Sequence, residues 1–232
     1  MIWNNLSKSI AKEYEEFPND FLNKPNSKAA YLGEGKNVWK KIKHHPYWAV
    51  DDLKDKHLFG QVDYNGYSHS TIRTVMYIKE MQKYFPAWNV RFLTDFGPGY
   101  GNSTRVWDVL FGQADSYYQL VDFEELQCIS RDYLAKHEIT ANHRTYDTML
   151  SPKDLGKSLF FASHSMNECS MEVRNSLEKS MADYDYIYIT YNSHFDNIDN
   201  LEYFEKLAKR LPHKAWTYHE QSTAKWRLIG VL

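Results

Sequence analysis

The feature that most constrains the fold is a short apolar segment followed at once by a run of alternating glycines. Arg91–Phe96 has the pattern of a buried strand, and Gly97, Gly99 and Gly101 follow it at every second position. Ser103–Phe111 then has the pattern of a helix. A loop of this kind brings backbone close to a ligand and points a helix N-terminus at it. The segment therefore predicts a strand–loop–helix unit that binds a ligand.

The glycine spacing and the acid before the glycines restrict that ligand. A dinucleotide-binding loop carries its third glycine three residues after the second, whereas here the third glycine is already Gly101 and position 102 is Asn102. Asp95 lies two residues before the first glycine, at the end of the predicted strand. An acidic side chain there repels a pyrophosphate, but it suits a ligand that carries an ammonium group and no phosphate.

A second acid follows the next predicted strand. Tyr117–Val121 is followed by Asp122, which lies 21 residues after Gly101. An acidic side chain in this position can accept hydrogen bonds from both ribose hydroxyls of a nucleoside. A glycine loop alone is often a structural turn, but Asp95 and Asp122 together favour cofactor binding.

With both acids in register, Asp95–Gly101 (DFGPGYG) resembles motif I of the class I methyltransferases. The resemblance covers roughly residues 90–232. It implies S-adenosylmethionine (SAM) as methyl donor and a Rossmann-like α/β fold, whose seven-stranded, mostly parallel sheet has its last strand antiparallel. For Asp147, which follows the third predicted strand, a bond to the adenine amino group and a surface turn are equal alternatives. The cofactor-binding residues that we expect are Asp95, Gly97, Pro98, Gly99, Tyr100, Gly101, Asp122, Phe123, Asp147 and Ser163.

Three segments carry a narrower resemblance: DFGPGYGNSTRVW, YYQLVDFEELQ and FFASHSMNECSMEVRNSL. They are similar to sugar O-methyltransferases of bacterial surface-polysaccharide clusters, which carry a DIGGGYGG-like loop and a Ser-x-Ser-x-x-Glu segment after the fourth strand. Ser163, Ser165 and Glu168 match that segment, whereas Pro98 and Asn102 replace glycines of the loop. This resemblance implies methylation of a hydroxyl on a sugar or surface-glycan precursor.

From about residue 91 onward, short apolar strands alternate with amphipathic helices, as in a parallel sheet covered on both faces. We expect strands at Arg91–Phe96, Tyr117–Val121, His143–Tyr146, Ser158–Ser163, Tyr186–Thr190, Ala215–His219 and Trp226–Val231. We expect helices at Ser103–Phe111, Glu124–Lys136, Pro152–Leu155, Met171–Met181 and Leu201–Arg210, with Asp199 and Glu202 as a capping box for the last. The short connection Glu220–Lys225 predicts an antiparallel hairpin of the last two strands.

Residues 1–90 have a different pattern, and we expect them to form a cap beside a methyltransferase domain at residues 91–232. Helices are expected over Lys8–Phe17 and Ser68–Tyr84, and a loop over Pro18–Lys36. The segment between them is rich in aromatic residues. It can pack on an edge of the sheet and can also line the acceptor pocket with Tyr47, Trp48, Tyr64 and Tyr67, and we expect some contact with the acceptor.

Bulk composition excludes several classes of function. A net charge of −2 and a pI near 6.6 give no general reason to bind nucleic acid or an anionic membrane. No apolar run is long enough to span a membrane, and the N-terminus lacks a signal-peptide core. Only two cysteines are present, which suits a reducing cytoplasm. We therefore expect a cytoplasmic enzyme, and the sequence leaves a homo-oligomer open.

Transfer to a hydroxyl calls for a general base, and ligands of such sheets lie at the carboxyl ends of the strands. His164, after the fourth strand, is the leading candidate for the base because histidine titrates near neutral pH. It could instead stack on the cofactor or bond to backbone. Glu168 could be a base, could orient His164 or could cap the next helix. His194, after the fifth strand, is the rival base, with Asp196 expected as a helix cap.

Other chemistries fit the sequence less well. His219-Glu220 is a third and weaker option for the base. No metal site is expected, because the fourth strand ends in Ser-His-Ser without an aspartate. Enzymes that methylate nucleic-acid nitrogens generally carry [DNS]-P-P-[YFW] here, and this chain does not. The alternatives that stay open are a non-sugar small-molecule acceptor and a non-catalytic module that binds the cofactor.

Overall fold

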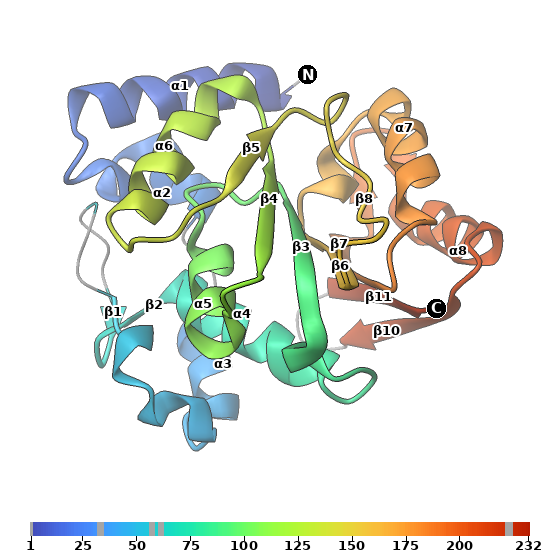
Figure 1. Cartoon of the computed structure of the whole chain (residues 1–232). Helices are drawn as coiled ribbons and strands as arrows, with labels where there is room; N and C mark the ends of the chain where they lie inside the picture. The colour runs from blue at the N-terminus through green and yellow to red at the C-terminus, as the bar shows by residue number, and fades with distance from the viewer. Residues whose placement is uncertain (1, 32–34, 56–58, 60–62, 221–224) are drawn as a thin grey trace. The chain divides into compact units, whose positions relative to one another are not determined.

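The computed structural model describes residues 2–31, 35–55, 59, 63–220 and 225–232 (Figure 1). The chain forms two compact units. Unit 1 comprises residues 1–83, 99–112 and 123–140, and unit 2 comprises residues 84–98, 113–122 and 141–232. The chain passes from unit 2 to unit 1 inside the glycine loop, between Pro98 and Gly99.

Unit 2 contains a seven-stranded sheet with the order β10-β11-β7-β6-β3-β4-β5. Its strands are β3 (Val90–Phe96), β4 (Tyr117–Val121), β5 (Asn142–Arg144), β6 (Lys157–Ser163), β7 (Tyr186–Asn192), β10 (Lys214–Glu220) and β11 (Lys225–Val231). β11 pairs antiparallel with both β7 and β10, and the other pairs are parallel. All seven predicted strands and the final antiparallel hairpin are therefore confirmed.

The strand order places the glycine loop at a switch point of the sheet. β3 lies between β4 and β6. β4 and β5 extend the sheet on one side of β3, and the later strands, beginning with β6, extend it on the other side. In open α/β sheets, ligands bind outside the carboxyl ends of the strands where the order reverses in this way. The segment that the sequence singled out therefore occupies the position where this fold binds ligands.

An apolar core joins the sheet of unit 2 to two helices, α7 (Met171–Met181) and α8 (Asn200–Arg210). Its buried side chains include Phe92 and Phe160 from the sheet, Leu177 from α7 and Phe204 from α8. The Asp199 carboxylate accepts a bond of 3.1 Å from the Glu202 N–H, which confirms Asp199 as the N-cap of α8. A two-stranded hairpin, β8 (His194–Phe195) with β9 (Ile198–Asp199), follows β7.

Unit 1 is helical. It contains α1 (Ile2–Glu16), α2 (Pro25–Tyr31), α3 (Gly35–Ile42), α4 (His69–Met81), α5 (Asn102–Phe111) and α6 (Glu124–Ala135). Short 3-10 turns η1 (Phe21–Asn23), η2 (Pro46–Ala49) and η3 (Asp51–Leu53) and the two-stranded pair β1 (Asp63–Tyr64) and β2 (Tyr67–Ser68) connect them. α1 packs on α2 and α6, and α4 packs on α3 and α5. The Tyr14 hydroxyl on α1 donates to Asp132 on α6 over 2.5 Å.

Two of the predicted segments have a different structure. Pro18–Lys36, predicted to be a loop, contains η1, α2 and the start of α3. Pro152–Leu155, predicted to be a helix, is a single turn closed by a 3.2 Å bond from the Leu155 N–H to the Pro152 carbonyl. Asp154 has a φ of +67°, and this left-handed backbone stops the turn from continuing as a helix.

The aromatic stretch of unit 1 packs largely on itself. Trp48 lies 4.6 Å from Tyr67 and 5.0 Å from Trp39 between ring centroids. Tyr67 is buried, and the Tyr47 hydroxyl accepts a bond from Gln82. The side chain of Tyr64, also expected as a wall, lies outside the described residues.

Candidate active site

The first half of the glycine loop follows directly from the end of β3. Gly97 has a φ of +68°, and its N–H donates to the Val121 carbonyl on the neighbouring strand over 2.8 Å. A Cβ added at this glycine would lie 2.2 Å from the Cβ of Ser165, so the backbone and that side chain are already in contact. Both the backbone conformation and this close approach require glycine at position 97.

The second half of the loop belongs to unit 1. Gly99 has a φ of +57°, and Gly101, with a φ of +92°, is the residue before α5. The Gly101 carbonyl accepts the first bond of that helix, from the Arg105 N–H at 3.1 Å. Tyr100 between them is buried. The loop therefore ends at a helix N-terminus whose first N–H groups have no partner within the helix, as the sequence predicted.

The predicted cofactor acids differ in exposure. Asp95 is only 1% exposed at the end of β3, so its carboxylate lies inside the protein. Asp122 follows β4, is half-buried, and donates its N–H to the Arg144 carbonyl over 3.1 Å. Phe123 next to it is 37% exposed. Asp147 is exposed in a turn after β5, which is the surface position considered as its alternative.

The loop after β6 packs against the glycine loop and carries His164. Ser165 contacts Gly97, and its hydroxyl donates to the Phe96 carbonyl. His164 has a φ of +60°, a left-handed conformation that is uncommon for a bulky residue. Its N–H lies 3.0 Å from the Thr190 carbonyl and 3.1 Å from the Thr190 hydroxyl on β7. The leading candidate base is therefore held by a neighbouring strand at a strained backbone, which is a frequent property of functional sites.

Two neighbours of His164 were expected to contribute. The Ser163 hydroxyl is buried and has no hydrogen-bond partner among the residues that the structure describes. Glu168 is half-buried at the end of a 3-10 turn, η6 (Met166–Glu168). The N-cap of α7 is Ser170, whose hydroxyl accepts from the Val173 N–H at 3.5 Å.

The rival base lies in the β8–β9 hairpin. His194 is exposed, and its Nε2 lies 3.9 Å from an oxygen of Asp199. Asp196 forms the hairpin turn with a φ of +50°, so the prediction of a helix cap at Asp196 is wrong. The backbone of His219 lies in β10, whereas the side chains of His219 and Glu220 are outside the described part of the chain.

A buried arginine that was not predicted from the sequence joins the loops of the two candidate bases. Arg174 on α7 is fully buried, and burial lowers the pKa of its guanidinium. The group donates to the carbonyls of Cys169 at 3.0 Å and Asn167 at 2.5 Å, and to the Asn200 side chain at 2.8 Å. The Asn200 amide in turn donates to the Asn192 carbonyl at the end of β7 over 3.0 Å. The only signal in the sequence is a charged residue among apolar positions of α7.

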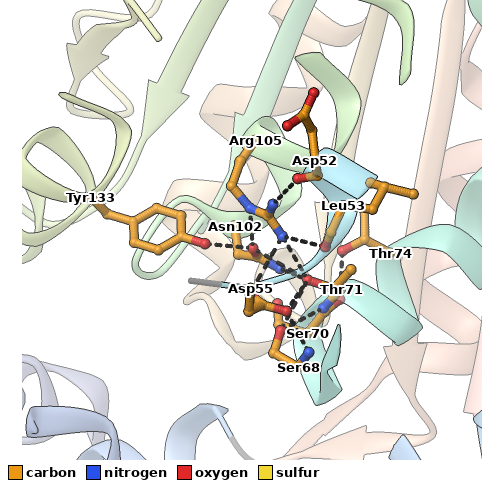
Figure 2. Close-up of polar contacts among 10 residues, drawn as sticks. All are labelled: Asp52, Leu53, Asp55, Ser68, Ser70, Thr71, Thr74, Asn102, Arg105 and Tyr133. Carbon is orange, nitrogen blue, oxygen red and sulfur yellow. Dashed lines mark hydrogen bonds and ion pairs between the residues drawn. The ribbon is translucent and has the colours of Figure 1, made fainter. Parts of the chain in front are cut away.

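A second buried arginine holds the helix that follows the glycine loop (Figure 2). Arg105 on α5 donates to the carbonyl of Asp52 at 2.9 Å and the hydroxyl of Thr71 at 2.9 Å. Asn102, at the first position of α5, donates to the same Thr71 hydroxyl over 3.0 Å and accepts from Tyr133 at 2.8 Å. The asparagine that replaces a motif glycine is thus the centre of a buried network.

Asp55 is the only carboxylate that bonds to Arg105 within the described residues, at 3.4 Å. Burial raises the pKa of Asp55, and the charge of Arg105 and hydrogen bonds from Ser68 and Thr71 oppose that effect. Both side chains are at most 5% exposed. Removing one member of such a pair leaves a buried charge without its partner, which is costly.

Comparison with known proteins identifies the fold. No family model matches the chain, and no curated protein matches its sequence. EvdMO1 is similar in structure, with a TM-score of 0.52 and 12% identity over 82% of this chain and 47% of its own. The methyltransferase domain of a bacterial Hen1, CtHen1-C, has a TM-score of 0.50 and 9% identity over 69% and 96%. The chain has the Rossmann-like methyltransferase fold.

A third structure with this fold comes from Nostoc punctiforme PCC 73102. It is assigned as an O-methyltransferase and has a TM-score of 0.51 and 8% identity over 71% of this chain and 58% of its own. This chain therefore spans only about half the length of two of the three structures. Within the described ranges, no helix combines the length and the apolar character that a membrane crossing requires. The same residues contain no group of three or more His, Cys, Asp or Glu side chains that could hold a metal ion.

Proposed function

We propose that this chain is a SAM-dependent methyltransferase that acts on a hydroxyl of a sugar or surface-glycan precursor. The observation that carries the proposal is the glycine loop at the switch point of a Rossmann-like methyltransferase sheet, with Asp122 at the end of the adjacent strand. Positive φ values at Gly97 and Gly99 support a backbone shaped for close approach by a ligand. Residues 91–232 form the methyltransferase domain in this proposal, and residues 1–90 form a cap that contributes to the acceptor pocket.

The residues at the loop fit the parts of the donor. The half-buried carboxylate of Asp122 suits the two ribose hydroxyls, and the exposed ring of Phe123 offers an apolar surface to the adenine. Asp147 offers an exposed carboxylate for the adenine amino group. No cationic side chain is needed, because the donor carries no phosphate. When bound, SAM supplies a methyl group that is electrophilic because it is attached to a sulfonium.

The protein must align the acceptor and remove its proton. Alignment of two reactants is worth up to ~7–11 kcal/mol in ideal cases, and a general base adds roughly 10²–10⁴-fold. His164 is the base in our proposal, because its loop contacts the glycine loop through Ser165. His194 is exposed in a hairpin beside Asp199 and is the less favoured base. In this proposal Glu168 orients His164. The buried Ser163 hydroxyl bonds to the cofactor.

The acceptor class is tested by supplying SAM and separate panels of sugars and nucleotide-sugars, phenols and amines, and RNA. Release of S-adenosylhomocysteine (SAH) and the mass gain of one methyl group on the acceptor report transfer. We expect methylation in the sugar panel only. Transfer only to a phenol or amine contradicts the sugar acceptor and leaves the methyltransferase standing. SAM binding without transfer in any panel favours a non-catalytic module.

A further inference from the structure

The segment between β6 and α7, which we call the His164 loop, carries two features that are unfavourable on their own. His164 has a left-handed backbone with a φ of +60°, which is costly for a residue with a large side chain. Further along the loop, Asn167 is fully buried, and its side-chain amide has no hydrogen-bond partner among the residues that the structure describes. A buried polar group without a partner lowers stability. Such an arrangement persists only where the surrounding structure holds it.

Arg174, near the start of α7, supplies that constraint. Its guanidinium donates to two backbone carbonyls of the His164 loop, those of Asn167 at 2.5 Å and of Cys169 at 3.0 Å. The side chain is fully buried, and its Cζ lies 4.7 Å from the centroid of the Tyr203 ring on α8. Its hydrogen bonds within the described ranges go to carbonyl and amide oxygens and to no carboxylate. A buried cation without a counter-charge is expensive, so Arg174 suits a role in fixing one arrangement of the loop more than a role in adding stability.

The third bond of the guanidinium reaches the loop that follows the neighbouring strand. Arg174 donates to the side-chain oxygen of Asn200 at 2.8 Å, and the Asn200 amide donates to the Asn192 carbonyl over 3.0 Å. The Asn200 N–H donates to the Ser193 carbonyl over 2.9 Å. β6 and β7 pair in parallel, so their carboxyl ends lie at the same edge of the sheet. Arg174 therefore ties together the two loops that follow these strands, and all of these residues belong to unit 2.

Resting on the proposed function, we infer that Arg174 is a positioning residue that holds the His164 loop in the arrangement required to remove the acceptor proton. It acts through backbone carbonyls and through Asn200, and not by contact with a reactant. Misplacement of reacting groups by about 1 Å can lower a rate on the order of 10²-fold, so loss of this constraint acts on turnover. None of the three partners of the guanidinium belongs to the glycine loop, so SAM binding should persist without it.

The test compares Arg174→Met with the wild-type chain. Methionine removes the donors, fills irregular space and leaves no buried carboxylate without its partner. We expect the SAM dissociation constant, measured by calorimetric titration, to stay close to the wild-type value. The kcat for the acceptor that wild type methylates in the sugar panel, measured by SAH release, should fall on the order of 10²-fold.

Hydrogen exchange of backbone amides reports the loop without any acceptor. The His164 N–H bonds to Thr190 on β7, and in Arg174→Met it should exchange faster than in wild type. The Gly97 N–H, which bonds to the Val121 carbonyl inside the sheet, should exchange at the wild-type rate. A change at His164 alone separates loosening of this loop from general loss of stability.

Two further variants serve as controls. Arg210→Ala is the matched control, because Arg210 also ties α8 to α7, through a more exposed pair with Glu178 at 2.9 Å. It should keep the wild-type kcat and the wild-type exchange at His164. Arg174→Lys keeps the charge without the forked set of donors, and it should recover part of the kcat that Arg174→Met loses.

A folded Arg174→Met protein that keeps the wild-type kcat, or whose His164 N–H exchanges at the wild-type rate, overturns the inference. An equal loss of kcat in Arg210→Ala overturns it as well, because any loosening between α7 and α8 would then suffice. If Arg174→Met does not fold, Arg174→Lys is judged by the same two criteria. Wild-type protein that transfers to no acceptor overturns the proposed function, and exchange at His164 then decides whether Arg174 holds the loop.

Discussion

Replacement of His164 by glycine removes the imidazole and relieves the backbone at the same site. A left-handed conformation such as the φ of +60° at His164 costs a non-glycine residue roughly 1–2 kcal/mol. Glycine avoids that cost. However, a glycine loses more conformational freedom on folding than an alanine does, which lowers the free energy of unfolding by roughly 0.5–1 kcal/mol. His164→Ala keeps the strained backbone and also lacks the imidazole. The glycine variant is therefore expected to be up to about 1.5 kcal/mol more stable than the alanine variant.

Two assays check this pair of variants. For a chain of this size, 1 kcal/mol shifts the melting temperature by roughly 2–4 °C, so His164→Gly should melt up to about 6 °C above His164→Ala. Both variants should lose roughly 10²–10⁴-fold in kcat, measured by SAH release with the acceptor found in the screen. Exposed His194→Ala is the control and should stay near wild type in both assays. A His164→Gly enzyme that keeps its kcat refutes the role as base, and one that melts below His164→Ala refutes the argument from backbone strain.

Two further predictions concern buried charge. Arg105→Ala leaves Asp55 buried without its partner and should lower the free energy of unfolding by roughly 3–5 kcal/mol in urea titration. Arg91→Ala, which breaks a more exposed pair with Asp115, should cost at most about 1 kcal/mol; equal losses would contradict the burial argument. Burial lowers the pKa of His213 below its usual 6.5. As the pH falls, the His213 imidazole therefore binds a proton at a higher pH in the unfolded chain than in the folded protein. The stability that neutral His213 contributes should be complete above about pH 6.5 and decline below it, and His213→Asn should flatten that decline, whereas an unchanged slope would rule out His213 as its source.

Local sequence patterns were sufficient for the sheet and for the glycine loop. The strands of unit 2 are short apolar runs bounded by turn residues, and the loop is defined by its own glycines and by Asp122, which follows the next strand. His164 was found because it directly follows a strand end. Its left-handed backbone, held by Thr190 from another strand, leaves no mark in the local sequence.

Features that depend on distant partners could not be predicted. The Arg105 guanidinium bonds to the Asp52 carbonyl, which is 53 positions away, and no local periodicity reports such a pairing. The helix α2 was missed because its first turn is satisfied by Glu13 from α1 and not by a residue of its own. At Pro152–Leu155 the proline signal was present, but the left-handed Asp154 decided the local structure.

The central claim is that the glycine loop and Asp122 bind SAM, and calorimetric titration with SAM tests it most directly. We expect wild-type protein to bind in the micromolar range and Asp122→Ala to lose that binding, because the ribose hydroxyls lose their acceptor. Asp115→Ala, which changes an exposed acid just before β4, is expected to bind as wild type does. Absence of binding by folded wild-type protein, or equal binding by Asp122→Ala, would contradict the account.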